Sequence, residues 1–205
     1  DVFFRELGLP APAACLAVGS APHGVQTGTT MIKLEPELIE RAIDGVVVAG
    51  DVNSTLAAAL VAVKLHIPVA HIESGLRSFD RTMPEEINRL VTDALADILW
   101  TPSPDGDTNL MREGVPAEKI QQVGNIMIDS LEMVREKIER EETLENLHLN
   151  RREFAVVTLH RPSNVDAPEM LKKLSETLVD VSSMIPLVFP IHPRTRKNIE
   201  TAGLS

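Results

Sequence analysis

The sequence predicts an α/β protein built on parallel sheets. Short apolar, β-branched runs alternate with longer amphipathic runs along the chain, which is the pattern of repeated strand–helix–strand units. The alternation stops once, over the polar segment 140–153 (REETLENLHLNRRE), and then resumes. Because crossovers between parallel strands are right-handed and carry helices, this pattern predicts two parallel sheets with helices on both faces.

Strands are expected where uncharged runs are short and rich in valine, isoleucine or alanine. Residues 45–50 (GVVVAG) have the composition of a strand that is buried on both faces. The other expected strands lie at 68–72, 98–101, 120–123, 154–159 and 187–191.

Helices are expected between these strands. Residues 53–65 are rich in alanine, and Asn53 or Ser54 is a suitable N-terminal cap. Pro84 stands in the first turn of the next expected helix, 84–98, where proline is well tolerated. The remaining expected helices lie at 102–114, 125–142, 167–183 and 194–201, with a fraying helix end and a linker over 140–153.

Composition and charge exclude several classes of function. Of 205 residues, 43% are hydrophobic and 24% charged, and the formal net charge is −10. Because an acidic chain repels phosphate backbones and anionic membranes, neither nucleic acid nor a membrane surface is an expected partner. The sequence has no apolar run of the roughly 20 residues that span a bilayer, and no signal-peptide pattern opens it. Cys15 is the single cysteine, which fits a reducing compartment, so we expect a cytoplasmic protein.

Ionisable residues stand where an open α/β sheet binds its ligands, just beyond the carboxyl ends of the strands. Asp51 follows the first expected strand, Glu73 the second, and His160 the strand that opens the second sheet. Two alternatives to a role in a cleft stay open. Asp51 is also suited to cap the following helix, and Glu73 is also suited to pair with Arg77.

A second acidic segment, PEEINR, begins the helix expected at 84–98. Glu85 lies in its first turn, where the helix dipole favours a carboxylate. Arg89 lies four residues later on the same helix face. The alternative to a functional role is an exposed ion pair between these two residues, worth about 0.3–0.5 kcal/mol.

The histidines differ in what their neighbours indicate. His160 and the adjacent Arg161 at the end of a strand favour an anion nearby. His71 lies inside a strand and is expected in the core, whereas His23 and His192 are expected in loops. No Cys/His set has zinc spacing, and the sequence lacks a glycine-rich dinucleotide fingerprint or P-loop.

Together these segments resemble the non-hydrolysing UDP-N-acetylglucosamine 2-epimerase family. The similarity is carried by 50–93, in which HIESGLR and MPEEINR stand at a specific spacing, and is supported by HGVQT, VGNIMIDSL, TLHRPSNVD and FPIHPRTRK. It covers essentially the whole chain.

The resemblance implies a GT-B-type fold. This fold has two Rossmann-like domains, each a three-layer α/β/α arrangement with a parallel sheet, and binds its ligand between them. The N-terminal domain is expected at 1–145 without its first strand, and the start of an incomplete nucleotide-binding domain at 146–205. Family members begin with a Gly-Thr-Arg-Pro-Glu loop and continue into a Ser-Gly-Gly…Glu-Glu segment. This sequence contains neither, so we expect a fragment cut short at both ends.

The resemblance also implies a reaction and a set of site residues. The reaction is reversible conversion of UDP-GlcNAc to UDP-ManNAc by a cytoplasmic homodimer, without a metal or nicotinamide cofactor, for bacterial surface polysaccharides. UDP leaves by anti-elimination to give 2-acetamidoglucal and then adds back. By motif, the catalytic residues are Asp51, Glu73, Glu85 and His160. Substrate-binding residues are expected at Arg89, Arg161, Arg77, His192 and Asn53, and Gln26 is expected to face a second, regulatory UDP-GlcNAc.

Three other functions stay open. A hydrolysing relative would release free ManNAc and UDP, and a GT-B glycosyltransferase would use the same architecture for sugar transfer. The third alternative is an inactive, incomplete fragment that binds a sugar nucleotide or dimerises without catalysis.

Overall fold

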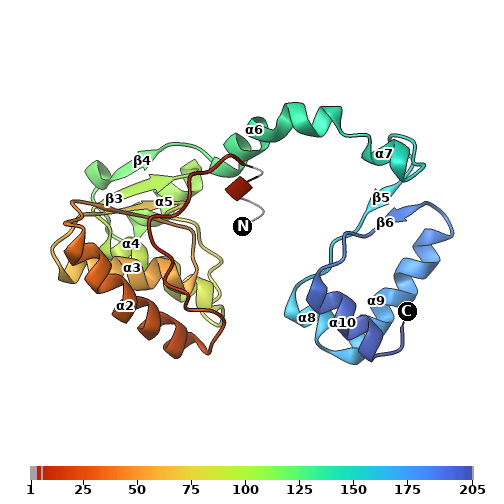
Figure 1. Cartoon of the computed structure of the whole chain (residues 1–205), viewed down its shortest axis with the longest axis horizontal. Coiled ribbons are helices and arrows are strands. Elements are labelled where there is room, and N and C mark those ends of the chain that lie inside the picture. The colour runs from red at the N-terminus through yellow and green to blue at the C-terminus, as the bar shows by residue number, and fades with distance from the viewer. Residues whose placement is uncertain (1–3, 6, 205) are drawn as a thin grey trace. The chain divides into compact units, whose positions relative to one another are not determined.

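The chain divides into two compact units, Asp1–Glu136 and Lys137–Ser205. The computed structural model describes residues 4–5 and 7–204, and of Pro162 it describes the backbone alone. Strands and helices alternate along both units (Figure 1), and every strand pair in the described part of the chain is parallel. The α/β class and the parallel sheets predicted from periodicity are therefore confirmed.

The N-terminal unit is built on a four-stranded parallel sheet. Its strands are β1 (Val46–Ala49), β2 (Val69–Ile72), β3 (Ile98–Thr101) and β4 (Ile120–Gln122). They lie side by side in chain order, β1-β2-β3-β4, and each falls inside a predicted range. In register, Val48 lies beside His71, and His71 beside Leu99, so these three side chains share one face of the sheet.

The helices that follow the strands of this unit lie in the predicted places. They are α3 (Asn53–Lys64), α4 (Pro84–Leu95), α5 (Pro104–Arg112) and α6 (Ile126–Arg140), which crosses into the second unit. The 3-10 turn Ala117–Lys119, before β4, is not predicted. Among the described residues, no helix combines the length and the apolar character that a membrane span needs.

One long helix, α2 (His23–Glu40), is not predicted by the sequence pattern. His23, expected in a loop, is its first residue. Gly24, Gly28 and Pro36 lower the intrinsic helix propensity of this segment and obscure its periodicity. The helix forms because it packs along α3, where its Leu38 is buried. Tertiary packing here overrides local propensity.

The core of this unit lies on one face of the sheet. Leu99 and Leu110 are fully buried there, and complete burial of a leucine contributes about 1.5–3 kcal/mol. On the opposite face, Val47 and Ile98 are 59% and 38% exposed. The sequence pattern predicts helices on both faces, but strands in sequential order bring right-handed crossovers back on the same side. The buried cluster consists of Leu38, Val48, Ala59, Val61, Ala62, Val69, Ala96, Leu99 and Leu110.

The start of α3 is fixed by a threonine and not by the predicted caps. Val52 occupies the N-cap position and makes no side-chain cap, and Asn53 and Ser54 lie inside the helix. The Thr55 hydroxyl donates a hydrogen bond to the carbonyl oxygen of Ala49 at 2.7 Å. This bond ties the first turn of α3 to the end of β1. Asp51 lies outside the N-cap, so the capping alternative for it is wrong.

Two glycines bring the turn after β2 into contact with α5. Gly75 has a φ of +78°, and a Cβ there would lie 2.5 Å from the carbonyl oxygen of Gly106. A Cβ on Gly106, which lies in α5, would in turn be 3.1 Å from the carbonyl oxygen of Ser74. Backbone therefore packs on backbone at this point, and α5 fixes the turn that follows Glu73.

The C-terminal unit repeats the strand–helix pattern on a smaller scale. β5 (Ala155–Val156) and β6 (Leu187–Val188) pair in parallel, and both are shorter than predicted. The short helices α7 and α8 are not predicted, whereas α9 and α10 stand where the sequence predicts helices. The bounds are α7 (Thr143–Asn146), α8 (Pro162–Val165), α9 (Pro168–Ser182) and α10 (Pro193–Thr201).

Side-chain to backbone hydrogen bonds attach α10 to the rest of this unit. The buried Thr195 hydroxyl donates to the carbonyl oxygen of Leu159 at 2.7 Å. The Asn198 amide donates to the carbonyl oxygen of Val165 at 2.8 Å. Val165 and Leu171 are the buried apolar side chains against which these helices pack. The loop after β5, which contains His160, is therefore held next to the start of α10.

Replacing Gly75 with alanine should lower the free energy of unfolding by about 2–4 kcal/mol, since strain in a left-handed conformation adds to a backbone clash. Gly114→Ala is the matched control, because Gly114 also has a positive φ, +86°, but no atom lies within 4 Å of its Cβ position. Urea denaturation of both variants measures the difference. Equal losses would contradict the proposed packing role of Gly75.

Candidate active site

Parallel pairing of β1 and β2 brings the first two predicted acids together. Ala49 lies in register with Ile72, so the residues that follow these strands emerge side by side at the carboxyl edge of the sheet. The Glu73 carboxylate oxygen Oε2 lies 3.6 Å from the position that a Cβ on Gly50 would take. Asp51 is the next residue along the chain. Two carboxylates from separate segments thus stand at one edge.

Glu73 adopts an unusual backbone conformation. Its φ is +67°, in the left-handed region, which costs about 1–2 kcal/mol for a residue with a Cβ. Flanking bonds hold it there, because Gly50 N–H donates to the carbonyl of Ile72 at 3.1 Å and Ser74 N–H to that of Trp100 at 3.2 Å. The half-buried Glu73 side chain makes no hydrogen bond or ion pair with the described residues.

Arg89 lies between two carboxylates. One guanidinium nitrogen is 2.5 Å from Asp51 Oδ2, and another is 2.9 Å from Glu86 Oε2. Burial alone would lower the pKa of Arg89, but its hydrogen bonds to Asp51 and Glu86 raise it overall, so the group stays charged. The exposed pair between Glu85 and Arg89 that spacing predicts is not formed. Arg89 instead reaches across to the end of β1.

A cavity of about 450 Å³ opens beside Asp51, between the loop after β1 and the first turns of α2 and α4. Glu85 faces this cavity and is half-buried, without a hydrogen bond or ion pair to the described residues. Asp51 and Glu85, predicted as catalytic, therefore share one cavity, and so do Asn53 and Gln26. Its polar lining includes His23, Gln26, Asp51, Asn53, Glu85 and Asn88.

Amides link the cavity lining into a network centred on Asn53. The Asn53 amide donates to Gln26 Oε1 at 2.7 Å and lies 3.0 Å from His23 Nδ1. The Asn88 amide donates to the carbonyl oxygen of Asp51 at 2.8 Å. The residue expected at a regulatory site, Gln26, is thus one hydrogen bond away from a residue expected to bind substrate.

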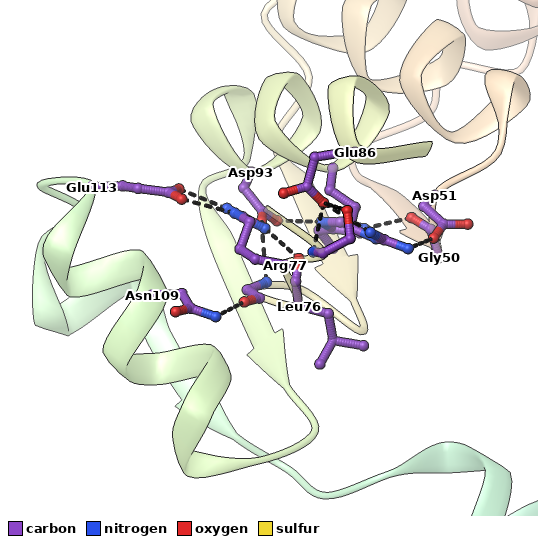
Figure 2. Close-up of polar contacts among 12 residues, drawn as sticks. Gly50, Asp51, Leu76, Arg77, Glu86, Asp93, Asn109 and Glu113 are labelled. Carbon is purple, nitrogen blue, oxygen red and sulfur yellow. Dashed lines mark hydrogen bonds and ion pairs between the residues drawn. The ribbon is translucent and has the colours of Figure 1, made fainter. Parts of the chain in front are cut away.

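Arg77 does not line this cavity. Its side chain is 1% exposed and pairs with Asp93 Oδ2 at 2.7 Å and with Glu113 Oε2 at 2.6 Å (Figure 2). Burial opposes its charge, but the hydrogen bonds to Glu113 and Asp93 and their charges raise the Arg77 pKa overall. The alternative of a Glu73–Arg77 pair is therefore wrong. The guanidinium expected to bind substrate is occupied inside the fold.

Asp93 joins Arg77 to the strand ends. Its second oxygen contacts His71 Nδ1 at 2.6 Å, and His71 Nε2 lies 2.8 Å from the carbonyl oxygen of Gly50. Asp93 also accepts a hydrogen bond from Gly75 N–H at 3.0 Å. His71 is fully buried, so its predicted place in the core is confirmed. This buried network fixes the backbone before Asp51 and the turn after Glu73.

The remaining predicted residues belong to the C-terminal unit. His160 and His192 both line a second cavity of about 450 Å³. His192 is the N-cap of α10, where its Nδ1 accepts a hydrogen bond from Arg194 N–H at 3.2 Å. Arg161 is exposed next to His160. Arg194, from the basic run after His192, pairs with Asp166.

Sequence reasoning missed Asn88 and Glu86. Asn88 lies three residues after Glu85, a spacing that places both on one helix face and was available as a signal. Glu86 had no such signal, since sequence cannot tell which member of a Glu-Glu pair turns inward. Within the described residues, no group of three or more His, Cys, Asp or Glu side chains is arranged to hold a metal ion.

A parallel sheet with acids and a cavity at its carboxyl edge defines the chain as an α/β protein of the Rossmann-like type, a class in which ligands bind at that edge. The chain belongs to the UDP-N-acetylglucosamine 2-epimerase family, whose model matches residues 1–204. The predicted GT-B-type class is confirmed by the solved structures that it resembles.

Two curated relatives show the extent of the similarity. The UDP-N-acetylglucosamine 2-epimerase of Methanocaldococcus jannaschii is 43% identical over 208 residues, which cover 99% of this chain and 57% of that protein. The UDP-2,3-diacetamido-2,3-dideoxy-D-glucuronate 2-epimerase of Pseudomonas aeruginosa is 42% identical over 207 residues, covering 100% and 57%. The chain thus spans little more than half the length of these relatives.

Solved structures give the same result. The M. jannaschii UDP-GlcNAc 2-epimerase in complex with UDP-GlcNAc and UDP matches with a TM-score of 0.86 and 42% identity, over 99% of this chain and 57% of that one. The UDP-N-acetylglucosamine 2-epimerase from Rickettsia bellii matches with a TM-score of 0.85 and 28% identity, over 97% and 53%.

Replacing Arg77 with glutamine should lower the free energy of unfolding by about 3–5 kcal/mol, because buried Asp93 loses its cation. Arg41→Gln is the control, since its 2.8 Å pair with Glu37 is exposed and contributes at most about 1 kcal/mol. Chemical denaturation of both variants checks the prediction. A small loss at Arg77 would show that the buried network does not stabilise the fold.

Proposed function

We propose that the protein converts UDP-GlcNAc reversibly to UDP-ManNAc by inverting C2 of the sugar. The observation that carries the proposal is the shared cavity of Asp51 and Glu85, with Glu73 against the adjacent strand end. Several acids in one place suit a reaction that moves a proton at carbon and passes through positive charge on a sugar ring. Family membership supports the same reaction.

The proposed chemistry is elimination followed by addition. A base removes the C2 proton while the bond from C1 to the UDP oxygen breaks, and its electron pair leaves with UDP. The C2–H electrons form the C1=C2 double bond of 2-acetamidoglucal. UDP then adds back to C1 as C2 receives a proton on the opposite face. Both transition states have oxocarbenium character, as in glycoside cleavage.

The geometry suggests a division of roles among the acids. Glu73 and Glu85 make no hydrogen bond or ion pair with the described residues, which suits groups that exchange protons with the sugar. Asp51 is held by Arg89 and suits a fixed negative charge beside the developing oxocarbenium ion. Asn53, from the same cavity, would bind the sugar.

Residues of the C-terminal unit would act on the diphosphate. We propose 1–145 as the sugar-side domain and 146–205 as the start of the nucleotide-binding domain. His160 and His192 line the same cavity, and Arg161 is the residue that follows His160. Cationic and hydrogen-bonding groups there would offset the charge on departing UDP. A regulatory UDP-GlcNAc at Gln26, a homodimeric assembly, a cytoplasmic location and a role in bacterial surface polysaccharide supply belong to the same proposal.

A second substrate deserves a direct test. The P. aeruginosa relative is about as similar to this chain as the M. jannaschii UDP-GlcNAc 2-epimerase is. Its name gives another nucleotide sugar as the substrate, UDP-2,3-diacetamido-2,3-dideoxy-D-glucuronate. Both names describe inversion at C2, so Asp51, Glu73 and Glu85 could carry out the same proton transfers on either sugar. Product analysis by NMR with each nucleotide sugar would identify the substrate. It would also detect free ManNAc from a hydrolysing enzyme, and sugar transfer would indicate a glycosyltransferase.

In the full-length protein, Glu73→Gln should lower kcat by about 100-fold or more, the usual loss for an acid–base group. The amide keeps the size of the side chain but cannot accept the proton. Glu118→Gln, at an exposed position in the 3-10 turn, is the control and should leave kcat unchanged. Wild-type turnover in Glu73→Gln would remove Glu73 from the mechanism.

Epimerisation in D₂O should place deuterium at C2 of the product, because the C2 proton exchanges with solvent through the catalytic acids. Proton NMR or mass spectrometry of the recovered nucleotide sugar measures the label. Product that forms without deuterium would argue against elimination and re-addition.

A further inference from the structure

Glu86 is a buried carboxylate with a full set of hydrogen-bond donors. It is 2% exposed. Its Oε2 accepts from Ser78 N–H at 2.9 Å, from the Ser78 hydroxyl at 3.0 Å and from Arg89 at 2.9 Å. Its Oε1 accepts from Phe79 N–H at 3.0 Å. Glu86 belongs to the first turn of α4, and Figure 2 marks its contacts with dashed lines.

The donors keep Glu86 ionised. Burial by itself raises the pKa of a carboxyl group, but the hydrogen bonds from Ser78, Arg89 and Phe79 lower the Glu86 pKa overall. A buried charge is tolerated only when it is paired and hydrogen-bonded. Glu86 therefore acts as a fixed anion, on which other groups are aligned.

Arg89 connects this anion to the candidate active site. One arm of its planar guanidinium contacts Glu86 and the other contacts Asp51, so the two carboxylates hold it from both ends. A guanidinium held in this way has one orientation, whereas a single contact would leave the side chain free to rotate. The position of Asp51 therefore depends on Glu86, which does not itself line the cavity.

Glu86 also fixes the loop between the two other acids. Ser78 and Phe79 lie between Glu73, at the end of β2, and Glu85, at the start of α4. Phe79 has a φ of +58° and is 76% exposed, so its own side chain does little to hold this strained backbone. The two backbone hydrogen bonds to Glu86 instead hold the loop at Ser78 and Phe79.

We propose that Glu86 is a positioning residue for the epimerisation: through Arg89 it orients Asp51, and through Ser78 and Phe79 it sets the loop that joins Glu73 to Glu85. This inference rests on the proposed function. Glu86 touches no substrate in this scheme. It differs from its neighbour Glu85, which faces the cavity and is assigned to the chemistry.

A double-mutant cycle tests whether Glu86 acts through Arg89. In the full-length protein, Glu86→Gln should lower kcat by about 10- to 100-fold, as expected for a misplaced catalytic group, and change KM by less than about 3-fold. In an Arg89→Lys background, where the two-armed contact is already lost, the same substitution should lower kcat by a factor at least about 3-fold smaller, because only the route through Ser78 and Phe79 is left to disturb. Equal factors in both backgrounds, or no loss in either, would overturn the proposal.

The control is Asp80→Asn, which removes a carboxylate from the same loop. Asp80 is exposed and accepts its hydrogen bonds from Thr82, so it does not contact Arg89. Its kcat should stay within about 2-fold of wild type. Circular dichroism confirms that each variant is folded. If Glu86→Gln does not fold, Glu86→Asp, which keeps the charge but shortens the reach, is measured by the same criterion.

A second measurement separates this proposal from the proposed function. Nitrogen-15 NMR of the Arg89 guanidinium reports its rotation about the Nε–Cζ bond, and this measurement does not require the protein to be catalytically active. Rotation should be slow in the wild type and at least about 10-fold faster in Glu86→Gln, because one of its two anchors is weakened. If the wild type epimerises neither nucleotide sugar but Arg89 is released as expected, the proposed function fails alone. Unchanged rotation would overturn the positioning role.

Discussion

The candidate site depends on the parallel pairing of β1 with β2. Their register puts the ends of both strands at one edge of the sheet, which brings Asp51 and Glu73 together from segments 22 positions apart in the sequence. The paired strands alone do not fix the loops that follow them. Two charged networks do so: Glu86 and Arg89 hold Asp51, while Asp93 holds His71 and Arg77 beneath the turn. Buried ionic groups thus fix the positions of the loops that follow β1 and β2.

The strands and most helices were predictable because their signals are local. Apolar runs and proline positions place β1 to β4 and α3 to α5 within a few residues. The strand-end rule also identified Asp51 and Glu73. α2 was missed, since Gly24, Gly28 and Pro36 argue against a helix that only packing on α3 stabilises. The extent of β5 and β6 was overestimated, because β propensity marks a strand without setting where its pairing stops.

The partners of charged residues were the least predictable feature. Spacing along α4 favours a Glu85–Arg89 pair, yet Arg89 binds Glu86 and Asp51. Likewise Arg77, four residues from Glu73, pairs with Asp93 and with Glu113 of a later segment. An ion pair is decided by which side chains the tertiary fold brings within reach, and sequence separation carries little of that information. For the same reason, the sequence did not show that Glu86, and not Glu85, forms the buried ion pair with Arg89.

The left-handed backbone of Glu73 has a consequence for how this fold can be altered. Glycine or asparagine fits that conformation with less strain than glutamate does. Selection for thermal stability alone would therefore drift toward those residues at position 73 and discard the carboxylate. Under the proposed acid–base role of Glu73, stability and chemistry make opposite demands on this residue. Libraries screened only for robustness would then enrich variants that fold better and turn over about 100-fold more slowly.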